Sequence, residues 1–265
     1  YYWLEKNYKE ENITEFIAAE KLEKFRRDNI NFFSPSFPTI SATGANGSII
    51  HYNPGRKSQV LKKGEIYLCD SGGQYFGATT DITRTIFLGD KPPDKLKVIY
   101  TKVLLGHLNI SMLKFPTGTR GYQLDSIARY NLWNDGLDYN HGTGHGVGSF
   151  LGVHEGPQSI SKNPNNVPLK PGMIISNEPG FYKKKSFGIR IENLVLVKDS
   201  LFKDYLEFET LSMFPYETKL INSNLLNSDQ KDWVSNYHNQ IYSKLSNFLD
   251  KKHSDWLKKK IEISN

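Results

Sequence analysis

The chain has 265 residues, of which 38% are hydrophobic and 23% are charged, as is typical of a folded globular protein rather than a disordered one. Much of its net charge of +6 comes from five lysines near Trp256, which we expect to form the solvated face of a terminal helix. No basic and aromatic motif accompanies them, so we expect no nucleic-acid partner. We expect no membrane partner either, because no apolar run approaches the ~20 residues that span a bilayer.

The N-terminal end, residues 1–6, has no initiator methionine and no signal-peptide pattern. We therefore expect the chain to be the C-terminal domain of a longer polypeptide. The single cysteine, Cys69, excludes an internal disulfide and favours a reducing compartment. We accordingly expect a cytoplasmic location.

Helices are predicted where apolar residues recur at a spacing close to 3.6 residues. Residues 12–27 show this pattern, and a second helix is expected to be capped by Asp94 and ended by Pro116. A third is predicted near residues 122–133. The tail over 228–249 is predicted to be an amphipathic helix packed on the domain, because it has an apolar residue at every fourth position: Trp233, Tyr237, Ile241, Leu245 and Leu249.

Strands are predicted over residues 65–70 and 79–88, with turn glycines between them. Shorter strands are expected in glycine-rich surroundings, at 48–52, 141–148, 173–178 and 188–197. No repeat or low-complexity linker divides the chain. These elements predict one α+β domain over residues 1–265, in which 217–265 form a C-terminal helical extension.

Two acidic residues flank the predicted turn between the first long strands. If the hairpin is centred between residues 75 and 76, Asp70 faces Asp81, with Cβ atoms roughly 4.5–5.5 Å apart, and the two charges repel. A cation between them, or a shared proton, would remove this conflict. The alternative is that Asp70 begins an ordinary turn and Asp81 is a solvated strand residue.

Three later segments add groups that bind metals. His141 and His145 lie in a glycine-rich run that lacks the features of a phosphate-binding loop, although it could be a plain flexible loop. Glu178 ends an apolar strand, where a carboxylate is costly without a partner. Strand alternation places Arg190 and Glu192 on one face, and the alternative for this pair is a simple ion pair.

Together these segments supply four carboxylates and one imidazole, from Asp70, Asp81, His145, Glu178 and Glu192. Two divalent cations would balance the four negative charges. A ligand set this rich in oxygen favours manganese, with cobalt, zinc or iron as alternatives. Two such ions about 3.5–4 Å apart can generate a nucleophile from water. No G-x-S-x-G or H-E-x-x-H motif supports another hydrolytic scheme, and Cys69 is expected to be a core residue.

At these positions the sequence resembles the aminopeptidase P family of Xaa-Pro aminopeptidases, which share the pita-bread fold with methionine aminopeptidase, prolidase and creatinase. The motifs that carry the resemblance are DSG at 70–72, TTDITRT at 79–85, HGTGHGVG at 141–148, NEPG at 177–180 and IRIEN at 189–193. The segment over 41–52 and the long tail resemble the cytosolic eukaryotic branch. The resemblance implies a mainly antiparallel curved sheet covered by helices.

The resemblance also implies roles for individual residues. Asp70 would bind one metal ion, His145 and Glu178 the other, while Asp81 and Glu192 would bridge both. Glu178 would in addition be the general base. The substrate site would be lined by His51, His141 and His154, while Tyr182 and Arg190 would brace the metal ligands.

The implied reaction is hydrolysis of the N-terminal Xaa-Pro bond of peptides by a hydroxide that bridges two metal ions, most readily Mn²⁺, with Co²⁺ or Zn²⁺ as alternatives. An Xaa-Pro bond has no N–H, so a site that polarises the carbonyl directly suits it. Alternatives are a prolidase-type dipeptidase, a methionine aminopeptidase, or a pita-bread module that binds peptides without catalysis. The resemblance further implies a homodimer and two N-terminal domains that precede this part of the chain.

Overall fold

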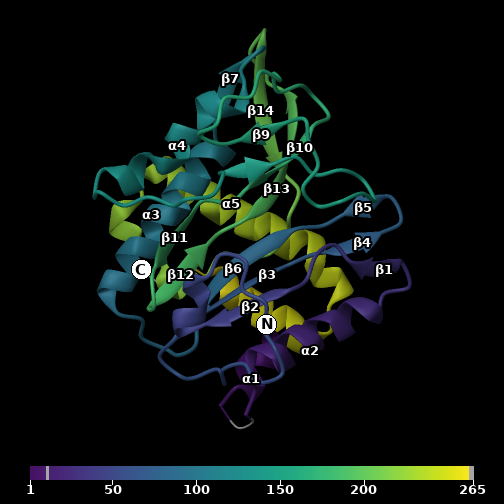
Figure 1. Ribbon diagram of the computed structural model, residues 1–265, viewed down its shortest axis with the longest axis vertical. Coiled ribbons are helices and arrows are strands. Elements are labelled where there is room, and N and C mark those ends of the chain that lie inside the picture. Colours follow the sequence, from purple (N-terminus) through teal and green to yellow (C-terminus); the bar gives the residue numbers. More distant parts are fainter. Residues whose placement is uncertain (10–11, 263–265) are drawn as a thin grey trace.

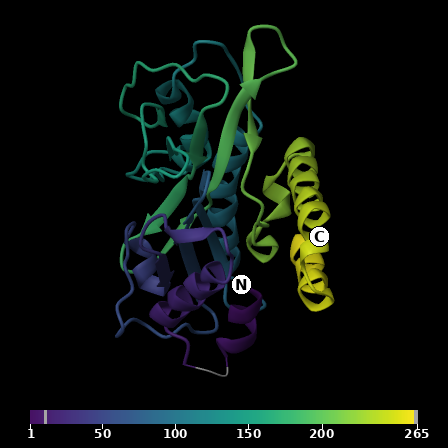
Figure 2. The ribbon, with the colours of Figure 1, turned by 90° about the vertical axis from the view of Figure 1, so that its right-hand side faces the viewer.

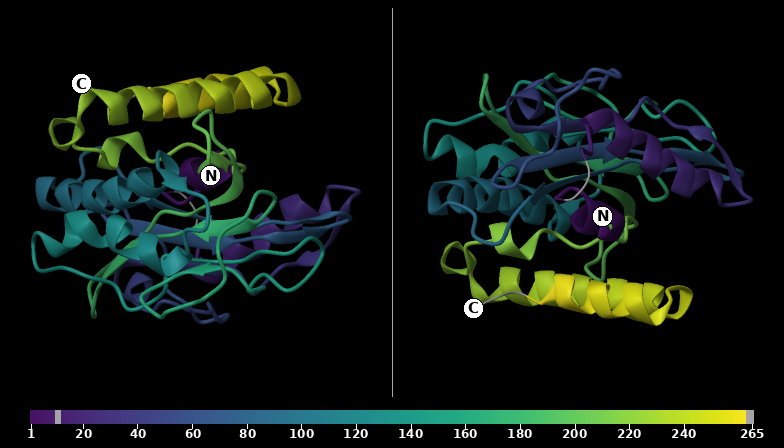
Figure 3. Two further views of the ribbon diagram at one scale, coloured as in Figure 1. Left: turned by 90° about the horizontal axis from the view of Figure 1, so that it is seen from above. Right: turned by 90° about the horizontal axis from the view of Figure 1, so that it is seen from below.

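Antiparallel strands occupy the middle of the molecule, and helices cover them (Figure 1). The computed structural model describes residues 1–9 and 12–262. Helices α5 (Ser228–Leu245) and α6 (Lys251–Ile261) form an outer layer on one side. They are separated from the strands by α3 (Asp94–Ser111) and by the segments that precede α5 (Figures 2 and 3). None of the helices in the described part of the chain combines the length and apolarity needed to span a bilayer.

Two sheets carry most of the strand pairing, and every pair in them is antiparallel. The first has the order β2-β3-β6, and the second has the order β10-β13-β14-β7. Their strands are β2 (Ile40–Thr43), β3 (Ile66–Ser71), β6 (Ile82–Phe87), β7 (Lys114–Pro116), β10 (Ile174–Asn177), β13 (Asn193–Asp199) and β14 (Tyr205–Thr210).

Three smaller sheets complete the strand structure, in the orders β1-β4-β5, β8-β9 and β11-β12. They comprise β1 (Phe32–Pro35), β4 (Gly73–Tyr75), β5 (Ala78–Thr79), β8 (Gly144–His145), β9 (Ser159–Ile160), β11 (Gly180–Lys183) and β12 (Phe187–Arg190). Separate helices with antiparallel sheets confirm the predicted α+β class.

The helices include those that the apolar spacing predicts. Their bounds are α1 (Tyr2–Asn7), α2 (Glu15–Arg27), α3 (Asp94–Ser111), α4 (Gly121–Trp133), α5 (Ser228–Leu245) and α6 (Lys251–Ile261). Helix α2 begins after Thr14, whose Oγ1 accepts from the Ile17 amide at 3.2 Å. Short 3₁₀ turns lie at Gly44–Ser48, Thr218–Leu220, Ser223–Leu225 and Ser246–Phe248.

The C-terminal helices pack on the rest of the molecule through one large apolar cluster. From α5 it contains Val234, Tyr237 and Ile241, which are buried together with residues of α3 and with Ile189 and Ile191. This confirms the predicted amphipathic tail, except that Leu249 lies beyond the helix and is 37% exposed. Of the five terminal lysines four are exposed, but Lys260 is mostly buried and pairs with Glu5 and Glu217.

Several predicted element boundaries are wrong. Pro93 rather than Asp94 is the N-cap of α3, because the fixed φ of proline suits the start of a helix. That helix ends at Ser111, well before Pro116, which lies in β7. The strand predicted over 48–52 is the end of a 3₁₀ turn and a following bend.

The predicted register of the first hairpin is also wrong. Asp70 pairs with Thr83 instead of Asp81, a shift of two residues. The tip of the hairpin turns at Gly77, which has a φ of +83°, so the turn lies one residue later than predicted. Asp81 consequently lies in a break between β5 and β6. The strand predicted over 188–197 is likewise divided, into β12 and β13, and Glu192 lies in its break.

Candidate metal centre

One cavity of about 670 Å³ collects ionisable side chains from segments that are distant in the sequence. The sequence-predicted residues that line it are His51, Asp70, Asp81, His141, His145, His154, Glu178, Arg190 and Glu192. Tyr182 does not line this cavity, but its hydroxyl lies behind it and contacts two of these residues. The five side chains predicted to bind metal therefore meet in one place.

Strand ends and strand breaks position these five side chains. Asp70 is the penultimate residue of β3, and His145 is the last residue of β8. Glu178 lies between β10 and β11, while Asp81 and Glu192 lie in the breaks described above. Within a regular strand, successive side chains point to opposite faces. At the interruptions this alternation ends, so neighbouring segments can all direct a polar group into the cavity.

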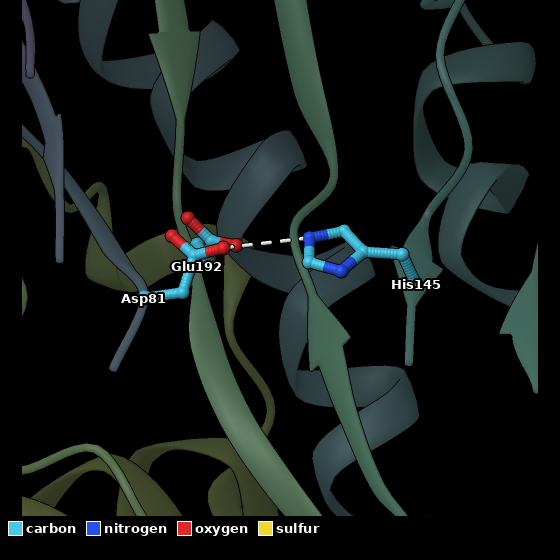
Figure 4. A group of neighbouring side chains, drawn as sticks. All are labelled: Asp81, His145 and Glu192. Atoms are coloured by element: carbon cyan, nitrogen blue, oxygen red, sulfur yellow. Dashed lines mark ion pairs between the residues drawn. The ribbon is translucent and has the colours of Figure 1, made fainter. Parts of the chain in front are cut away.

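Three of the acidic groups, Asp81, Glu178 and Glu192, lie within a few ångströms of the His145 ring (Figure 4). His145 Nε2 is 3.4 Å from Asp81 Oδ2 and 3.3 Å from Glu178 Oε1. Each of Asp81, His145 and Glu192 offers one ligand atom, and these three atoms lie within 4.8 Å of one another. Figure 4 shows the Asp81 and Glu192 carboxylates side by side, facing the imidazole.

The chemistry of the donor set fits divalent cations. Asp70 Oδ1 and Asp81 Oδ1 are two of the four buried side-chain atoms in the described residues that have no hydrogen-bond partner. Burial, reinforced by neighbouring carboxylates, raises the pKa of Asp81 and Glu192 well above the usual range. Crowded, buried carboxylates with unpartnered oxygens are unfavourable alone, and a cation is the group that would satisfy them.

Arg190 is the one buried cation that contacts this cluster directly among the described ion pairs. Its Nη2 donates to Asp70 Oδ2 at 2.6 Å, and its Nε donates to Thr83 Oγ1 at 3.2 Å. Arg190 therefore pairs with Asp70, which excludes the simple Arg190–Glu192 ion pair considered above. With all four carboxylates ionised, the guanidinium leaves a net of three negative charges in the cluster, so a single divalent ion does not neutralise it.

A chain of hydrogen bonds runs from Arg190 away from the acidic cluster. Arg190 Nη1 donates to the Tyr182 hydroxyl at 2.6 Å, and that hydroxyl lies 2.9 Å from His141 Nε2. His141 Nδ1 is 2.8 Å from the Gly142 carbonyl, which can only accept, so Nδ1 carries the proton and Nε2 accepts from Tyr182. Burial and the Arg190 charge lower the pKa of His141 to about 4. Both ring nitrogens of His141 thus bond within the protein.

Two hydroxyl residues that the sequence reasoning missed hold the carboxylates. Thr83 Oγ1 donates to Glu192 Oε2 at 2.6 Å. Ser176 Oγ donates to Glu178 Oε1 at 3.0 Å and accepts from the His145 amide at 2.9 Å. Each lies two residues from a predicted ligand, Asp81 for Thr83 and Glu178 for Ser176. Because these ligands lie outside regular strands, strand alternation did not mark the two hydroxyl residues.

The mouth of the cavity is lined by loops. His154 is exposed there, and its ring packs edge-on against the His145 ring with centroids 4.3 Å apart. His51 is also exposed. The sequence reasoning missed an apolar part of the wall, made by Phe37, Pro38, Ile40, Ile50 and Val153. Apart from Ile40 in β2, these residues lie in loops, where no periodic pattern marks them, so only the folded chain identifies them.

Comparison with known proteins places these observations in context. The pattern of metallopeptidase family M24 matches residues 2–199, and that of the C-terminal region of peptidase M24 matches residues 204–263. A protein of Coprinopsis cinerea named "Probable Xaa-Pro aminopeptidase P" is 48% identical over 97% of this chain and 43% of its own length. "Aminopeptidase P1" of Lotus japonicus is 47% identical over 94% of this chain and 39% of its own.

Solved structures give the same picture. The X-prolyl aminopeptidase of Caenorhabditis elegans, described as a cytosolic enzyme with a di-nuclear active site, matches with a TM-score of 0.94 and 35% identity over 99% of this chain and 44% of that chain. The prolidase of Pyrococcus furiosus matches with a TM-score of 0.65 and 32% identity over 75% of this chain and 56% of that chain. These likenesses confirm the predicted pita-bread fold. The chain spans less than half the length of the curated relatives described above.

Proposed function

Because the chain belongs to metallopeptidase family M24, we propose that it is the catalytic part of a Xaa-Pro aminopeptidase, which removes the residue that precedes a proline at a peptide N-terminus. The observation that carries the proposal is the meeting of Asp70, Asp81, His145, Glu178 and Glu192 in one cavity, with two buried carboxylate oxygens unpartnered. Aminopeptidase activity is favoured over prolidase activity because the curated relatives described above, 47–48% identical, are named as aminopeptidases, whereas the prolidase structure is 32% identical.

We propose that the five side chains hold two divalent metal ions. Asp70 would contact one ion, His145 and Glu178 the other, and Asp81 and Glu192 both. Oxygen-rich sites of this kind suit Mn²⁺, with Co²⁺ or Zn²⁺ as alternatives. When bound, such a pair activates water and polarises the scissile carbonyl. Arg190 fixes the Asp70 carboxylate by its hydrogen bond to Oδ2 and leaves Oδ1 available.

Glu178 is the candidate for proton transfer. Its carboxylate lines the cavity beside His145 and is held by the Ser176 hydroxyl at one oxygen. The other oxygen, Oε2, is 4.0 Å from His141 Nδ1 and has no shorter ion-pair contact among the described residues. We propose that Glu178 accepts a proton from the attacking water and delivers it to the proline nitrogen as the bond breaks.

The three histidines receive different roles. His51 and His154 are exposed at the cavity mouth, where they can donate hydrogen bonds to the substrate. His141 has both nitrogens engaged within the protein, so we propose that it positions the site through Tyr182 and Arg190. The apolar wall that includes Phe37, Ile50 and Val153 offers a surface for the proline ring.

The wider context is proposed on the same grounds. The relatives are named as Xaa-Pro aminopeptidases, and the C. elegans enzyme is described as cytosolic. We propose that residues 1–265 form one catalytic domain of a longer cytoplasmic protein, with 217–265 as a helical extension. We further propose that the enzyme is a homodimer that acts on peptides with proline in the second position.

The decisive experiment measures hydrolysis by the chain after metal removal and again after addition of Mn²⁺. An Ala-Pro-Ala tripeptide should be cleaved only with metal, and the Asp81→Asn variant should not cleave it. Cleavage of the Ala-Pro dipeptide alone would identify a prolidase. Cleavage of Met-Ala-Ala in place of Ala-Pro-Ala would identify a methionine aminopeptidase. Tight binding of the tripeptide without cleavage in any metal would identify a binding module.

A further inference from the structure

Arg84 is a buried arginine of β6 that follows Thr83 directly, and it is 1% exposed. Its five N–H groups have six oxygen atoms within hydrogen-bond distance, so one N–H is shared between two acceptors. All six acceptors lie on uncharged groups: the carbonyls of Thr83, Glu192, Phe214 and Pro215, the Asn193 side-chain oxygen and the Tyr237 hydroxyl. A guanidinium has five N–H donors in a rigid plane, so its partners are fixed relative to one another.

On one side Arg84 holds the backbone of Glu192. Arg84 Nη1 donates to the Glu192 carbonyl at 2.6 Å, and the Glu192 amide donates to the Thr83 carbonyl at 3.1 Å. The Thr83 hydroxyl bonds to the Glu192 carboxylate, as described above. Glu192 lies in the break between β12 and β13, where no strand pairing holds it. Thr83 and Arg84, two consecutive residues of β6, therefore hold Glu192 by hydrogen bonds where no paired strand does.

On the other side Arg84 holds the segment that leads into the C-terminal helices. Its Nη2 is 2.5 Å from the Phe214 carbonyl and 3.1 Å from the Tyr237 hydroxyl of α5, while Nε is 3.1 Å from the Pro215 carbonyl. The guanidinium also lies over the Tyr216 ring, 5.0 Å from its centroid. All these contacts belong to residues 204–263, the part matched as the C-terminal region.

We propose that the C-terminal region positions the Glu192 carboxylate through Arg84. This inference rests on the proposed metal centre and assigns to residues 204–263 a role in its assembly. If the 212–216 segment or α5 moves away, buried N–H groups of Arg84 lose their acceptors, which is costly. The lowest-energy arrangement keeps the C-terminal region, Arg84 and Glu192 together. Arg84 is thus a positioning residue, since it acts on the metal only through Glu192.

The test compares four variants of the whole chain. Arg84→Gln removes the charge and most donors, and Arg84→Lys keeps the charge. Tyr237→Phe removes one hydroxyl of the C-terminal region, which also lies 3.4 Å from Asn193 Oδ1. Ile241→Ala is the matched control: Ile241 is fully buried in the same helix, and among the described bonds none joins it to Arg84. It should lower the melting temperature of the protein without touching the Arg84 contacts.

Two measurements test the connection from the C-terminal region through Arg84 to Glu192. The first is titration with Co²⁺, monitored by its visible absorption, which reports the affinity of each metal site. We expect Arg84→Gln to weaken the binding of one of the two ions about tenfold or more, as is common when a residue that orients a metal ligand is lost. Tyr237→Phe should weaken the binding of the same ion about threefold, and the effect of Arg84→Lys should lie between those of Tyr237→Phe and Arg84→Gln. Ile241→Ala should bind both ions as wild type does. Amide exchange in metal-free protein should be about tenfold faster at Glu192 in Arg84→Gln, and faster in Tyr237→Phe, but unchanged in Ile241→Ala.

The inference would be overturned if Tyr237→Phe and both Arg84 variants kept the Co²⁺ affinities and the rate of Glu192 amide exchange of the wild type. An Ile241→Ala variant that weakens the metal as much as Tyr237→Phe would also overturn it. If Arg84→Gln does not fold, Arg84→Lys and Tyr237→Phe decide the question. A wild-type chain that binds no Co²⁺ would instead refute the proposed metal centre, while the exchange of the Glu192 amide would still test the link.

Discussion

At the residue scale, the acidic side chains of the cavity are arranged at a cost to the free energy of folding. Asp70 and Asp81 each leave a buried oxygen without a partner, and such an atom costs about 1–3 kcal/mol. Thr83 and Ser176 each satisfy one oxygen of a neighbouring carboxylate. Ligand atoms from Asp81, Glu192 and His145, one from each, lie within 4.8 Å of one another. We expect this arrangement to lower stability without cations and to favour their binding.

Neutral isosteres at the shared ligands test this arrangement. We expect Asp81→Asn and Glu192→Gln each to reduce Xaa-Pro hydrolysis at least about 100-fold. Loss of a residue that only orients a metal ligand typically costs about 10–100-fold, and loss of a ligand itself should cost at least as much. Each should also lower the amount of metal retained after dialysis, measured by elemental analysis. Asp135→Asn is the control, because Asp135 is an exposed acid that pairs with Lys102 and does not line the cavity. Near-normal turnover in Asp81→Asn or Glu192→Gln would refute their assignment as shared ligands.

At the element scale, close helix packing and buried polar contacts fix the layers around the strands. Helix α3 is largely buried and crosses α4 at Gly106, where an added Cβ would lie 2.2 Å from the Ala128 carbonyl oxygen. Helix α5 is anchored by His238 as well as by its apolar face. The His238 Nε2 accepts from the Tyr216 amide at 3.1 Å, and Nδ1 donates to the Ile261 carbonyl at 3.1 Å.

Gly106→Ala separates helix propensity from packing. Alanine favours the helix by about 1 kcal/mol relative to glycine, but here its methyl group would collide with the backbone of α4. We expect a net loss of up to about 2 kcal/mol in the free energy of unfolding, since overpacking usually costs about 1–3 kcal/mol and the helix propensity of alanine offsets about 1 kcal/mol of it. Urea denaturation measures it. Ser126→Ala, on the exposed face of α4, should stay within about 0.5 kcal/mol of wild type, and a stabilised Gly106→Ala would contradict the observed crossing.

The buried His238 predicts a pH dependence of stability. Burial lowers its pKa to about 4 in the folded protein, whereas an unfolded histidine titrates near 6.5. The unfolded state therefore binds more protons between these values, so stability falls as the pH falls. This residue alone should remove about 2 kcal/mol between pH 7 and pH 5. Denaturant unfolding at both pH values should show a smaller loss for His238→Gln than for wild type.

The half-exposed His253 provides the matched control for that experiment. His253→Gln should keep the wild-type difference in unfolding free energy between pH 7 and pH 5. If His238→Gln showed the full wild-type difference as well, the buried neutral state of His238 would be refuted.

At the scale of the whole molecule, the cavity joins parts of the chain that are otherwise held by separate sheets. Asp70 and Asp81 come from the side of β3 and β6, whereas His145, Glu178 and Glu192 come from the segments around β8, β10 and β13. Arg84 and the C-terminal region reinforce the same junction. Ions held between these groups would therefore stabilise the tertiary structure as well as supply chemistry.

Metal removal tests this coupling. We expect the melting temperature of wild type to rise with added Mn²⁺, because a ligand at 100 times its dissociation constant stabilises the native state by about 2.7 kcal/mol. Without metal, Asp81→Asn should melt at the same temperature as wild type or higher, since one repelling charge is gone. With saturating Mn²⁺ the order should reverse, as scanning calorimetry would show. Parallel behaviour of the two proteins with and without Mn²⁺ would contradict the shared site.

The sequence by itself determined the α+β class, most of the helices and the residue types of the site, because apolar spacing and short motifs are local properties of the chain. It predicted helices at α2, α3, α4 and α5 within a few residues. The family resemblance supplied the pita-bread fold, which the comparisons confirm. The roles of Asp70, Asp81, His145, Glu178 and Glu192 as ligands stay predictions, although the structure brings the five together.

Only the tertiary structure decided the partners. It moved the hairpin register by two residues, paired Arg190 with Asp70 rather than Glu192, and engaged both nitrogens of His141 within the protein. It also placed Arg84 against residues more than 100 positions away. The physical reason is that local patterns state which face of an element is buried, whereas the choice of partner depends on how distant elements pack and which buried polar groups must be satisfied there.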